Sequence, residues 1–459
     1  MKPTSTLLLT LTLASLPALH AADPAAGITG VTQSPVRLHM PPDAPEGDTI
    51  HYGLPQPFQI GPRTAAVFVS RHMHEKGVGD YVNGNDVFVF DSLASLAAAQ
   101  PLAMDRNDIV PDPVTGEKRV FEKWTGQGGF VPLGVLRADG TPHPHAGTGF
   151  HLQQSLGYFM KENGAPRPPD PKNPASQPQA RTMFYELSYD GKQLRVVDQS
   201  LPVGQHLFTE DKRWRISSPS SLRTAIPDGD DLLLAVRGHG KGHYSGVSRW
   251  ARRAEGWRPV SFQPMPEAER VQEADLARDA DGSLLFTFRP ADRGPTENYA
   301  LRVWRSRDGG ASWERIVEVP ETIGVEPRTV GTAADGSPFV IGNPVQPDRS
   351  YFREVLKLWP LNAARNGIEK PLVVRDAPAE FGPSPKHAKY PSNWKLDHPN
   401  TAVLRLADGQ WHCLLGYRVM RNDILQPGLA PESVHKVCGA YLEEIQSRGP
   451  ARAVWNFAE

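Results

Sequence analysis

An acidic and a basic residue lie on either side of a predicted hairpin. Glu273 and Arg289 are 16 residues apart, and Asp281-Gly282 lies between them. Asp-Gly between two apolar runs is a strong hairpin signal, because both turn residues tolerate a positive φ. A hairpin of this length can bring the carboxylate and the guanidinium to the same end of one sheet. A guanidinium held there offers a rigid set of donors for a carboxylate ligand, which lysine cannot reproduce.

Histidines form a second group that could do chemistry. They stand in Gly- and Pro-containing segments at His72 and His74, at His143, His145 and His151, at His239 and His243, and at His398. His-x-His on a strand can place two imidazoles on one face, which a zinc ion could use. No spacing supplies a third or fourth ligand. We therefore interpret these histidines as the lining of a polar cleft and expect no metal and no other cofactor, with a metal site as the less favoured alternative.

The elements that would position these residues are short strands joined by tight turns. Asp-Gly pairs recur at Asp139-Gly140, Asp190-Gly191, Asp228-Gly229, Asp281-Gly282, Asp335-Gly336 and Asp408-Gly409. The third, fourth and sixth of these lie in similar frames, with an alternating apolar strand before the turn and a strongly apolar strand after it. Gly229, Gly282 and Gly336 follow one another at intervals of 53 and 54 residues. A repeated hairpin of that period is typical of β-propeller blades.

Composition narrows the partners. Among 459 residues, 50 Lys and Arg nearly balance 51 Asp and Glu, for a net charge of -1. Nucleic acid is an unexpected partner, because neutralising its phosphates requires a clustered excess of basic residues. The 45 prolines and 41 glycines indicate a turn-rich globular protein. The Pro-rich segment 165–180 cannot supply the hydrogen bonds of a sheet interior and is predicted to be an exposed loop.

The first residues indicate export. Lys2 precedes an apolar run, Leu7 to Leu19, and small residues follow near Ala21. This order is typical of a signal peptide over residues 1–21, so we predict a secreted or periplasmic protein. The apolar run is too short for a permanent membrane helix, and we expect no integral membrane segment. The two cysteines, Cys413 and Cys438, could form one disulfide or remain as two buried thiols.

The segment "SRDGGASW" fits the Asp-box pattern Ser-x-Asp-x-Gly-x-x-Trp at Ser306, Asp308, Gly310 and Trp313. Its serine and aspartate side chains can bond to backbone groups of the turn, and its tryptophan can bury between blades. Such a box stabilises a hairpin and indicates an architecture, while it carries no reaction of its own.

Around this box, the chain from about Val271 to Leu358 resembles the sialidase (neuraminidase) family. In that family a catalytic Glu is followed, one hairpin later, by a substrate-binding Arg and then by an Asp box. The resemblance implies an all-β, six-bladed β-propeller that fills residues 22–459 as one domain. It implies that Glu273 activates a nucleophile and that Arg289 and Arg353 help to clamp a substrate carboxylate.

Further site residues follow from the resemblance with weaker sequence support. Arg63 would be the first arginine of the clamp. Asp86 would be the acid/base aspartate, since it precedes an apolar strand as in the family, and Asp80 is the alternative. The family's nucleophile is a Tyr with Glu as its base, and sialidases are exceptions to the usual two-carboxylate scheme.

The sequence departs from the family at this tyrosine. Where the family's tyrosine precedes a strand and an Asp-Gly turn, this chain has Asp397-His398-Pro399-Asn400. Tyr390 lies a few residues upstream and could be presented by a loop. His398 could otherwise carry out a different proton transfer.

The favoured function is therefore exo-acting hydrolysis of a terminal acidic sugar, sialic acid or a related sugar, on an oligosaccharide or glycoconjugate. Two alternatives stay open. A propeller polysaccharide lyase would also use arginines to neutralise a uronate and a His or Tyr to abstract the neighbouring proton. A non-catalytic glycan-binding propeller would keep the arginines and release no product. The sequence does not fix the oligomeric state.

Overall fold

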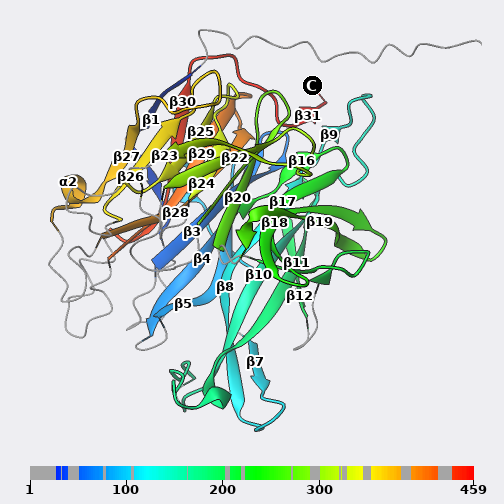
Figure 1. Ribbon diagram of the computed structural model, residues 1–459, viewed down its shortest axis with the longest axis vertical. Helices are drawn as coiled ribbons and strands as arrows, with labels where there is room; N and C mark the ends of the chain where they lie inside the picture. The colour runs from blue at the N-terminus through cyan, green and yellow to red at the C-terminus, as the bar shows by residue number, and fades with distance from the viewer. Residues whose placement is uncertain are drawn as a thin grey trace, which may run out of the picture.

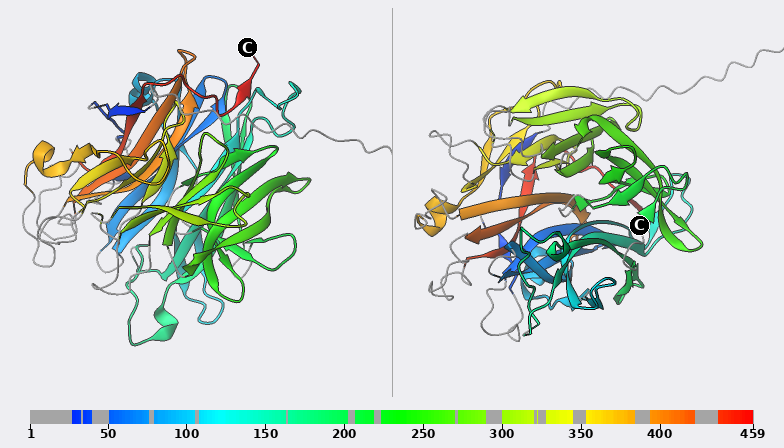
Figure 2. Two further views of the ribbon diagram at one scale, coloured as in Figure 1. Left: turned by 45° about the horizontal axis from the view of Figure 1, so that its top comes forward. Right: turned by 60° about the horizontal axis from the view of Figure 1, so that its bottom comes forward.

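The computed structural model describes residues 27–32, 34–39, 51–75, 79–104, 108–162, 164–201, 207–218, 223–269, 272–289, 300–319, 322, 328–344, 353–383, 394–421 and 437–458. Within these ranges, the structure describes only the backbone of residues 73–83, 122–125, 198–200, 266–269 and 272. Strands dominate, and the sheets are arranged around a common centre (Figure 1, Figure 2). The predicted all-β class and propeller arrangement are confirmed.

The described residues form six sheets of four to six strands and one two-stranded ribbon. The first sheet contains β3 (His51–Gly61), β4 (Thr64–Glu75), β5 (Gly79–Phe90) and β6 (Leu102–Ala103). The second contains β7 (Asp108–Pro111), β8 (Lys118–Val131), β10 (Thr148–Phe159), β11 (Gln179–Tyr189), β12 (Leu194–Ser200) and β15 (Arg223–Thr224). The third contains β13 (Leu207–Phe208), β14 (Arg215–Ser217), β16 (Ile226–Asp228), β17 (Asp231–His239), β18 (His243–Arg253) and β19 (Gly256–Glu269).

The second half of the chain repeats a simpler four-stranded meander. The fourth sheet contains β20 (Gln272–Arg278), β21 (Leu284–Arg289), β22 (Leu301–Ser306) and β23 (Glu314–Val319). The fifth contains β24 (Thr329–Thr332), β25 (Pro338–Gly342), β26 (Val355–Pro360) and β27 (Leu372–Asp376). The sixth contains β28 (Trp394–Arg405), β29 (Trp411–Arg421), β30 (Gly439–Ser447), β1 (Ile28–Val31) and β2 (Val36–Arg37). The ribbon pairs β9 (Val135–Leu136) with β31 (Asn456–Phe457).

Apolar side chains join each sheet to the next. Six of the buried clusters among the described residues each draw on two successive sheets. One cluster, for example, packs Leu285 of the fourth sheet with Val340 and Trp359 of the fifth. Another joins the first sheet to the sixth. Each sheet therefore packs against a neighbour on both of its faces. Its strands are accordingly apolar on both faces.

The two ends of the chain meet in the sixth sheet. Strand β1 pairs antiparallel with β30, and Ile28 lies opposite Ser447. The N-terminal strand therefore completes a sheet whose other large strands come from the end of the chain. Pairing of this kind ties the beginning of the described chain to the sixth sheet, with β1 as its outermost strand.

The Asp-Gly turns lie where the sequence predicts them. Four of them connect the first two strands of a repeat, and Gly229, Gly282, Gly336 and Gly409 all have a positive φ. The Ser306–Trp313 turn is held by its own side chains: Ser306 Oγ accepts the Gly310 N–H at 2.7 Å, and Asp308 accepts the Ser312 N–H at 2.9 Å. The Ser312 hydroxyl also donates to Asp308, and this bond, followed by those from the Ser312 N–H and the Ser306 hydroxyl, lowers the pKa of Asp308 to about 2. Trp313 packs against Phe286.

The innermost strands of three sheets share a bulge. In β3, β20 and β28 the register with the next strand shifts after Gly53, Gln272 and Asp397. The residue that follows in β20 and β28, Glu273 and His398, has a φ of 47° and 52°, and Leu54 in β3 has 55°. Left-handed backbone is costly for such residues. A bulge of this kind redirects the side chain that it carries.

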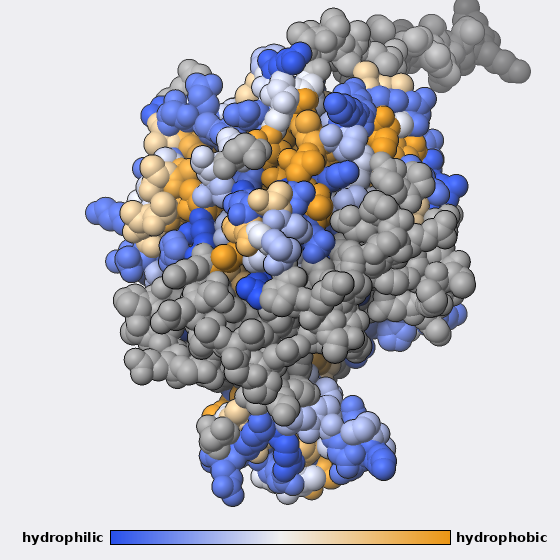
Figure 3. Space-filling model, turned by 90° about the vertical axis from the view of Figure 1, so that its left-hand side faces the viewer, coloured by the Kyte–Doolittle hydropathy of each residue, from blue (hydrophilic) through white to orange (hydrophobic). Residues whose placement is uncertain are grey.

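A lobe projects from the body of the ring, formed by β7 and the far ends of β8, β10 and β11 (Figure 1). The Pro-rich segment 165–180 lies here, mostly exposed, with a 3-10 turn at Pro174–Ser176, and β11 takes its last two residues. The lobe is largely hydrophilic on the face seen in Figure 3, whereas hydrophobic residues gather on the body above it. The helices α1 (Leu93–Ala98) and α2 (Ala377–Phe381) are short surface turns.

The cysteines resolve one open alternative. Cys413 and Cys438 are both buried free thiols, so the disulfide is not formed. Cys413 lies in the middle of its sheet, with its Sγ 3.4 Å from the Thr332 carbonyl oxygen. Burial raises the pKa of its thiol well above the usual range, which keeps it protonated. Within the described ranges, no helix has the length and apolar character needed to cross a membrane.

Candidate active site

Glu273 and Arg289 meet as the hairpin predicts. The Arg289 guanidinium donates to Glu273 Oε2 at 2.8 Å, and both side chains lie at one end of the β20–β21 hairpin. The glutamate side chain is only 6% exposed, and that of Arg289 is 16% exposed. A second arginine, Arg237 on β17, is close enough for Glu273 to raise its pKa, against a larger lowering by burial. Glu273 is thus a nearly buried carboxylate among guanidinium groups.

A second acid and its arginines lie on the sixth sheet and beside it. Asp397 is fully buried and accepts from Arg418 through both oxygens, at 2.8 and 2.9 Å. Arg353 donates to Asp397 Oδ2 at 2.7 Å, so the sequence-predicted Arg353 joins this group. Burial acts to raise the pKa of Asp397, but Arg418, with the help of His398 and Arg353, holds that pKa well below its usual range. Asp397 is therefore ionised at any physiological pH.

His398 follows Asp397 on the bulge of β28. Burial lowers the pKa of its imidazole well below 6.5, and Arg418, Arg353 and Arg223 lower it further against the opposing effect of Asp397. Within the part of the chain that the structure describes, His398 Nδ1 has no hydrogen-bond partner. The residue is a neutral imidazole with an unused ring nitrogen, held in a strained backbone conformation among cationic groups. Such strain is concentrated at functional sites in proteins.

A buried arginine forms the floor under these groups. Arg223 is 1% exposed and donates to the carbonyl oxygens of Pro399 and Arg328. Its Nε lies 3.6 Å from the Asp275 carboxylate, and its own carbonyl oxygen accepts from Gln56. Burial lowers the pKa of Arg223, and Asp275 and Glu273 partly offset this.

The Asp275 carboxylate completes that floor. Asp275 Oδ2 accepts the Val330 N–H at 3.1 Å and lies 2.7 Å from Thr329 Oγ1. Arg223 and Asp275 thus connect inner strands of several sheets across the centre of the ring. Polar groups this deeply buried are stable only when they are paired in this way.

Asp86 lies in a separate cluster. It accepts a hydrogen bond from Tyr52 at 2.5 Å and pairs with Arg71 at 3.5 Å. Burial raises the pKa of Asp86, although the Tyr52 hydrogen bond and Arg71 act in the opposite direction. No hydrogen bond or ion pair given for the described residues joins it to Glu273. Asp86 therefore remains a prediction as the acid/base, while its raised pKa fits a proton donor.

The structure does not bring Arg63 together with the other arginines of the predicted clamp. Arg63 is exposed in the turn after β3, and its guanidinium lies 3.5 Å from the Ala407 carbonyl oxygen, near the Asp408-Gly409 turn. Strand β3 has 11 residues and so spans roughly 35 Å at about 3.3 Å per residue. The turn after this strand is at the opposite end from Leu54 and the site. An apolar strand does follow Arg63, as the sequence predicts. The turn that carries Arg63 lies at the end of the sheet away from Glu273.

Two other predicted positions lie outside the described residues. Tyr390 falls in 384–393, and the side chain of the alternative Asp80 is not described. Tyr417 is described, and it is buried between the fifth and sixth sheets, where it donates to Glu443 and accepts from Arg375. Burial, followed by Glu443, raises the pKa of Tyr417 well above 10. It is a structural hydrogen-bonding residue.

Sequence reasoning missed most of the second acid cluster. Asp397 was noted only as part of a departure, and Arg418 was not noted at all. A signal was present, because Asp397 and Arg418 stand on either side of Asp408-Gly409 just as Glu273 and Arg289 stand on either side of Asp281-Gly282. Arg223 carries no comparable signal, since its role depends on a parallel pairing of the short β15 with β8.

The described residues do not form the metal site that was the less favoured alternative for the histidines. Among them, no group of three or more His, Cys, Asp or Glu is placed to hold a metal ion. His239 and His243 do lie together, with their Nδ1 atoms 2.6 Å apart, and Ser217 Oγ lies 2.7 Å from His239 Nε2. The pair is at the exposed turn between β17 and β18.

Known proteins resemble this chain in structure and not in sequence. No protein-family model matches the chain, and no curated protein sequence matches it. A protein of unknown function from Dyadobacter fermentans superposes with a TM-score of 0.51 and 13% identity, covering 92% of this chain and all of that one. The K499G mutant of NanB sialidase from Streptococcus pneumoniae gives 0.51 and 11%, covering 90% of this chain and 71% of the other.

An intramolecular trans-sialidase from Ruminococcus gnavus, in complex with oseltamivir carboxylate, gives a TM-score of 0.50 at 10% identity and covers 87% of this chain and 96% of that one. Likeness at this identity defines the fold. The chain is a sialidase-like β-propeller, and the group that contains Glu273, Arg289, Arg353 and Asp397 lies at one end of the inner strands.

Proposed function

We propose that this protein is an exported, sialidase-like glycoside hydrolase that removes a terminal acidic sugar from a glycan. Each of the six large sheets would be one blade of a ring, which the six inter-sheet clusters support. The proposed export rests on the N-terminal sequence pattern alone.

The observation that carries the proposal is the Glu273–Arg289 pair on a strained bulge. Glu273 adopts a φ that glutamate rarely takes, and it is nearly buried against a guanidinium. A fold does not need this arrangement for stability, because a hydrophobic residue at that point would avoid the burial of charge. Arg289, Arg353 and Arg237 supply the positive charge that a sugar carboxylate would bind. The overall net charge of -1 offers no general attraction for such a substrate.

In this reaction Glu273 would take a proton from the attacking nucleophile. A hydroxyl nucleophile is weak at neutral pH and needs an adjacent base. Tyr390 is the candidate on sequence grounds. Asp86, with its raised pKa, would donate the proton to the leaving sugar oxygen.

A second candidate function has its own support in His398. A neutral imidazole beside Arg418 and Arg353 could remove the proton next to a uronate carboxylate whose charge those arginines offset. The product would then be an unsaturated sugar, as in a polysaccharide lyase.

Product analysis of the full chain separates these reactions. Sialylated and uronate-rich glycans would be incubated with the native protein and with Glu273→Gln and His398→Gln. The hydrolase predicts release of a free acidic sugar and a loss of at least 100-fold in kcat/KM for Glu273→Gln, with folding intact. An unsaturated product absorbing in the near ultraviolet, lost in His398→Gln, would establish the lyase instead.

Arg63→Gln is the matched control, because Arg63 lies at the other end of the sheet. Its activity should equal that of the native protein. Near-native turnover in both Glu273→Gln and His398→Gln would overturn the catalytic roles proposed for these residues. If the native protein forms no product from any of the glycans, glycan binding without catalysis is left, and equilibrium titration of the same glycans would measure it.

A further inference from the structure

A cavity of about 890 Å³ lies at the opposite ends of the inner strands. Glu273 begins β20, whereas Leu276 to Arg278 at the end of that strand line the cavity. Likewise His398 lies in the first half of β28, and Val403 and Leu404 at its end line the cavity. The cavity is therefore on the axis of the ring, separated from the candidate active site by the Arg223–Asp275 floor.

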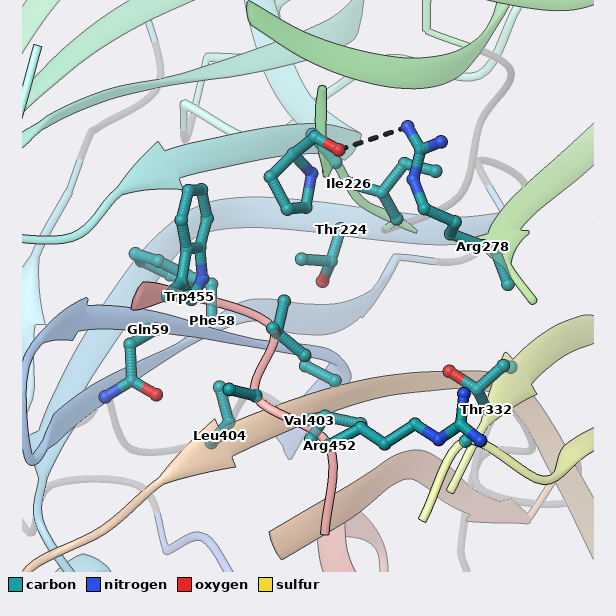
Figure 4. A pocket seen from close by; sticks show the side chains of 18 of the residues that line it. Phe58, Gln59, Thr224, Ile226, Arg278, Thr332, Val403, Leu404, Arg452 and Trp455 are labelled. Atoms are coloured by element: carbon teal, nitrogen blue, oxygen red, sulfur yellow. Dashed lines mark hydrogen bonds between the residues drawn. The ribbon is translucent and has the colours of Figure 1, made fainter. Parts of the chain in front are cut away.

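Most side chains that face this space are apolar. They include Phe58, Phe130, Ile226, Val403, Leu404 and Trp455, from five different parts of the chain (Figure 4). A concave site of this size, lined mainly by apolar and aromatic groups, is typical of a small-molecule site.

Several polar groups of the wall already have partners within the protein. Gln59 donates to three carbonyl oxygens and accepts the Arg405 N–H at 2.7 Å. Thr224 donates to the Pro57 carbonyl oxygen, and Arg278 bonds to the Asp228 carboxylate and to the Pro227 carbonyl oxygen (Figure 4). A sugar would find few unmet donors or acceptors here, whereas an apolar body would lose nothing on entry.

Arg452 differs from the other two arginines of the wall, Arg137 and Arg278, which are each paired with an aspartate. Its guanidinium makes one hydrogen bond, to the Ala280 carbonyl oxygen at 3.3 Å, and it has no ion pair with any carboxylate of the described residues. The side chain is exposed at the rim and extends along the cavity toward Thr332 (Figure 4). A cation with unused donors at the edge of an apolar space favours a ligand with one anionic group.

The C-terminal strap, residues 449–457, crosses the mouth of this cavity. Gly449 N–H donates to Asp335, Arg452 N–H donates to the Ala334 carbonyl oxygen, and β31 pairs with β9 at the far side. Arg452 to Asn456 all line the cavity. The strap thus covers the space from the fifth sheet to β9 and contributes Trp455 and Arg452 to the lining.

We propose that this axial cavity binds a small monoanionic amphiphile, whose apolar chain lies among the inner strands and whose anionic group contacts Arg452 on the strap. This binding site is distinct from the active site and does not depend on the proposed function. The ligand class is set by the apolar wall and the single unpaired guanidinium.

The test is titration of the full chain with decanoate, below its micelle-forming concentration, by calorimetry. We expect one decanoate per chain. Thr332→Trp should weaken binding at least tenfold by filling the space, and Val403→Phe serves the same purpose if that variant unfolds. Arg452→Glu should weaken decanoate at least tenfold, while the neutral probe decan-1-ol changes by less than twofold.

Arg448→Glu is the matched control, since it makes the same charge change four residues away and does not line the cavity. It should bind decanoate as the native protein does, and so should Glu273→Gln. No saturable decanoate binding up to millimolar concentration would overturn the proposal. So would equal weakening by Arg448→Glu and Arg452→Glu, or unchanged binding in folded variants with the cavity filled.

Discussion

The β20–β21 and β28–β29 hairpins are built alike and use their charges differently. Each has an acid on the inner strand, an Asp-Gly turn and an arginine opposite, with a left-handed residue at a bulge. In β20 the acid itself, Glu273, occupies the bulge and faces a partly exposed Arg289. In β28 the acid precedes the bulge and is fully buried, and His398 occupies the bulge. The hairpin frame is constant, and the bulge position carries the residue whose chemistry varies.

This difference distinguishes a structural carboxylate, Asp397, from a candidate catalytic one, Glu273. Asp397, with Arg418 and Arg353, anchors the sixth sheet, and every oxygen of the carboxylate is used. Among the described residues, Glu273 has one ion pair, and its partner is less enclosed. Leu54 shows that the same bulge can also carry an apolar residue, which packs in the core and has no chemistry.

Removal of the buried charge of Asp397 should have the largest effect on stability. Asp397→Asn leaves Arg418 buried without its counter-charge, which should lower the free energy of unfolding by about 3–5 kcal/mol. Glu273→Gln removes one charged hydrogen bond beside a partly exposed arginine and should cost about 1.5–3 kcal/mol. Urea denaturation of both variants measures this. A larger cost for Glu273→Gln would mean that it, and not Asp397, is the structural acid.

Two histidines should change the stability of the protein with pH in opposite directions: His151, whose pKa is shifted by burial alone, and His412, which has acidic neighbours. His151 on β10 is fully buried, its ring nitrogens have no partner within the described residues, and burial lowers its pKa to about 3. Below pH 6.5 the unfolded chain binds a proton that the folded protein excludes until about pH 3, so stability falls as pH decreases. This should amount to about 2 kcal/mol between pH 7.5 and pH 5.

His151→Phe should remove that loss, because phenylalanine does not titrate. Thermal unfolding at the two pH values, compared with the native protein, gives the difference. His412 provides the opposite sign, since Glu444 and Asp408 raise its pKa and its contribution is present below pH 6.5. A parallel pH profile for His151→Phe and the native protein would contradict the assignment.

The smallest effect isolates the backbone of the bulge. At His398 the glycine variant should be more stable than the alanine variant by about 1–2 kcal/mol, because only glycine adopts a positive φ without cost. The same order should hold at Glu273. At the extended position 402 of the same strand the order reverses, and Ala402→Gly should cost about 0.5–1 kcal/mol. Chemical denaturation measures all of these, and an unchanged order at His398 would remove the argument from strain.

The turns and the hairpins could be predicted, because their signals are local. Asp281-Gly282 fixed both the turn and the meeting of Glu273 with Arg289. The position of Arg63 could not be predicted, because the sequence does not give the length of the strand before it. That strand has 11 residues and places the turn with Arg63 at the far end of the sheet. The axial floor could not be predicted, because Arg223 reaches the Pro399 carbonyl oxygen across 176 residues of chain.

The pairing of β1 with β30 also governs how this chain reaches its folded state. Ile28 lies opposite Ser447, which is synthesised 419 residues later. A growing chain can therefore complete the sixth sheet only after β30 has been synthesised. Native contacts this distant in sequence make folding slow, typically milliseconds to seconds in simpler β proteins. Until β1 pairs with β30, the sixth sheet lacks its outermost strand.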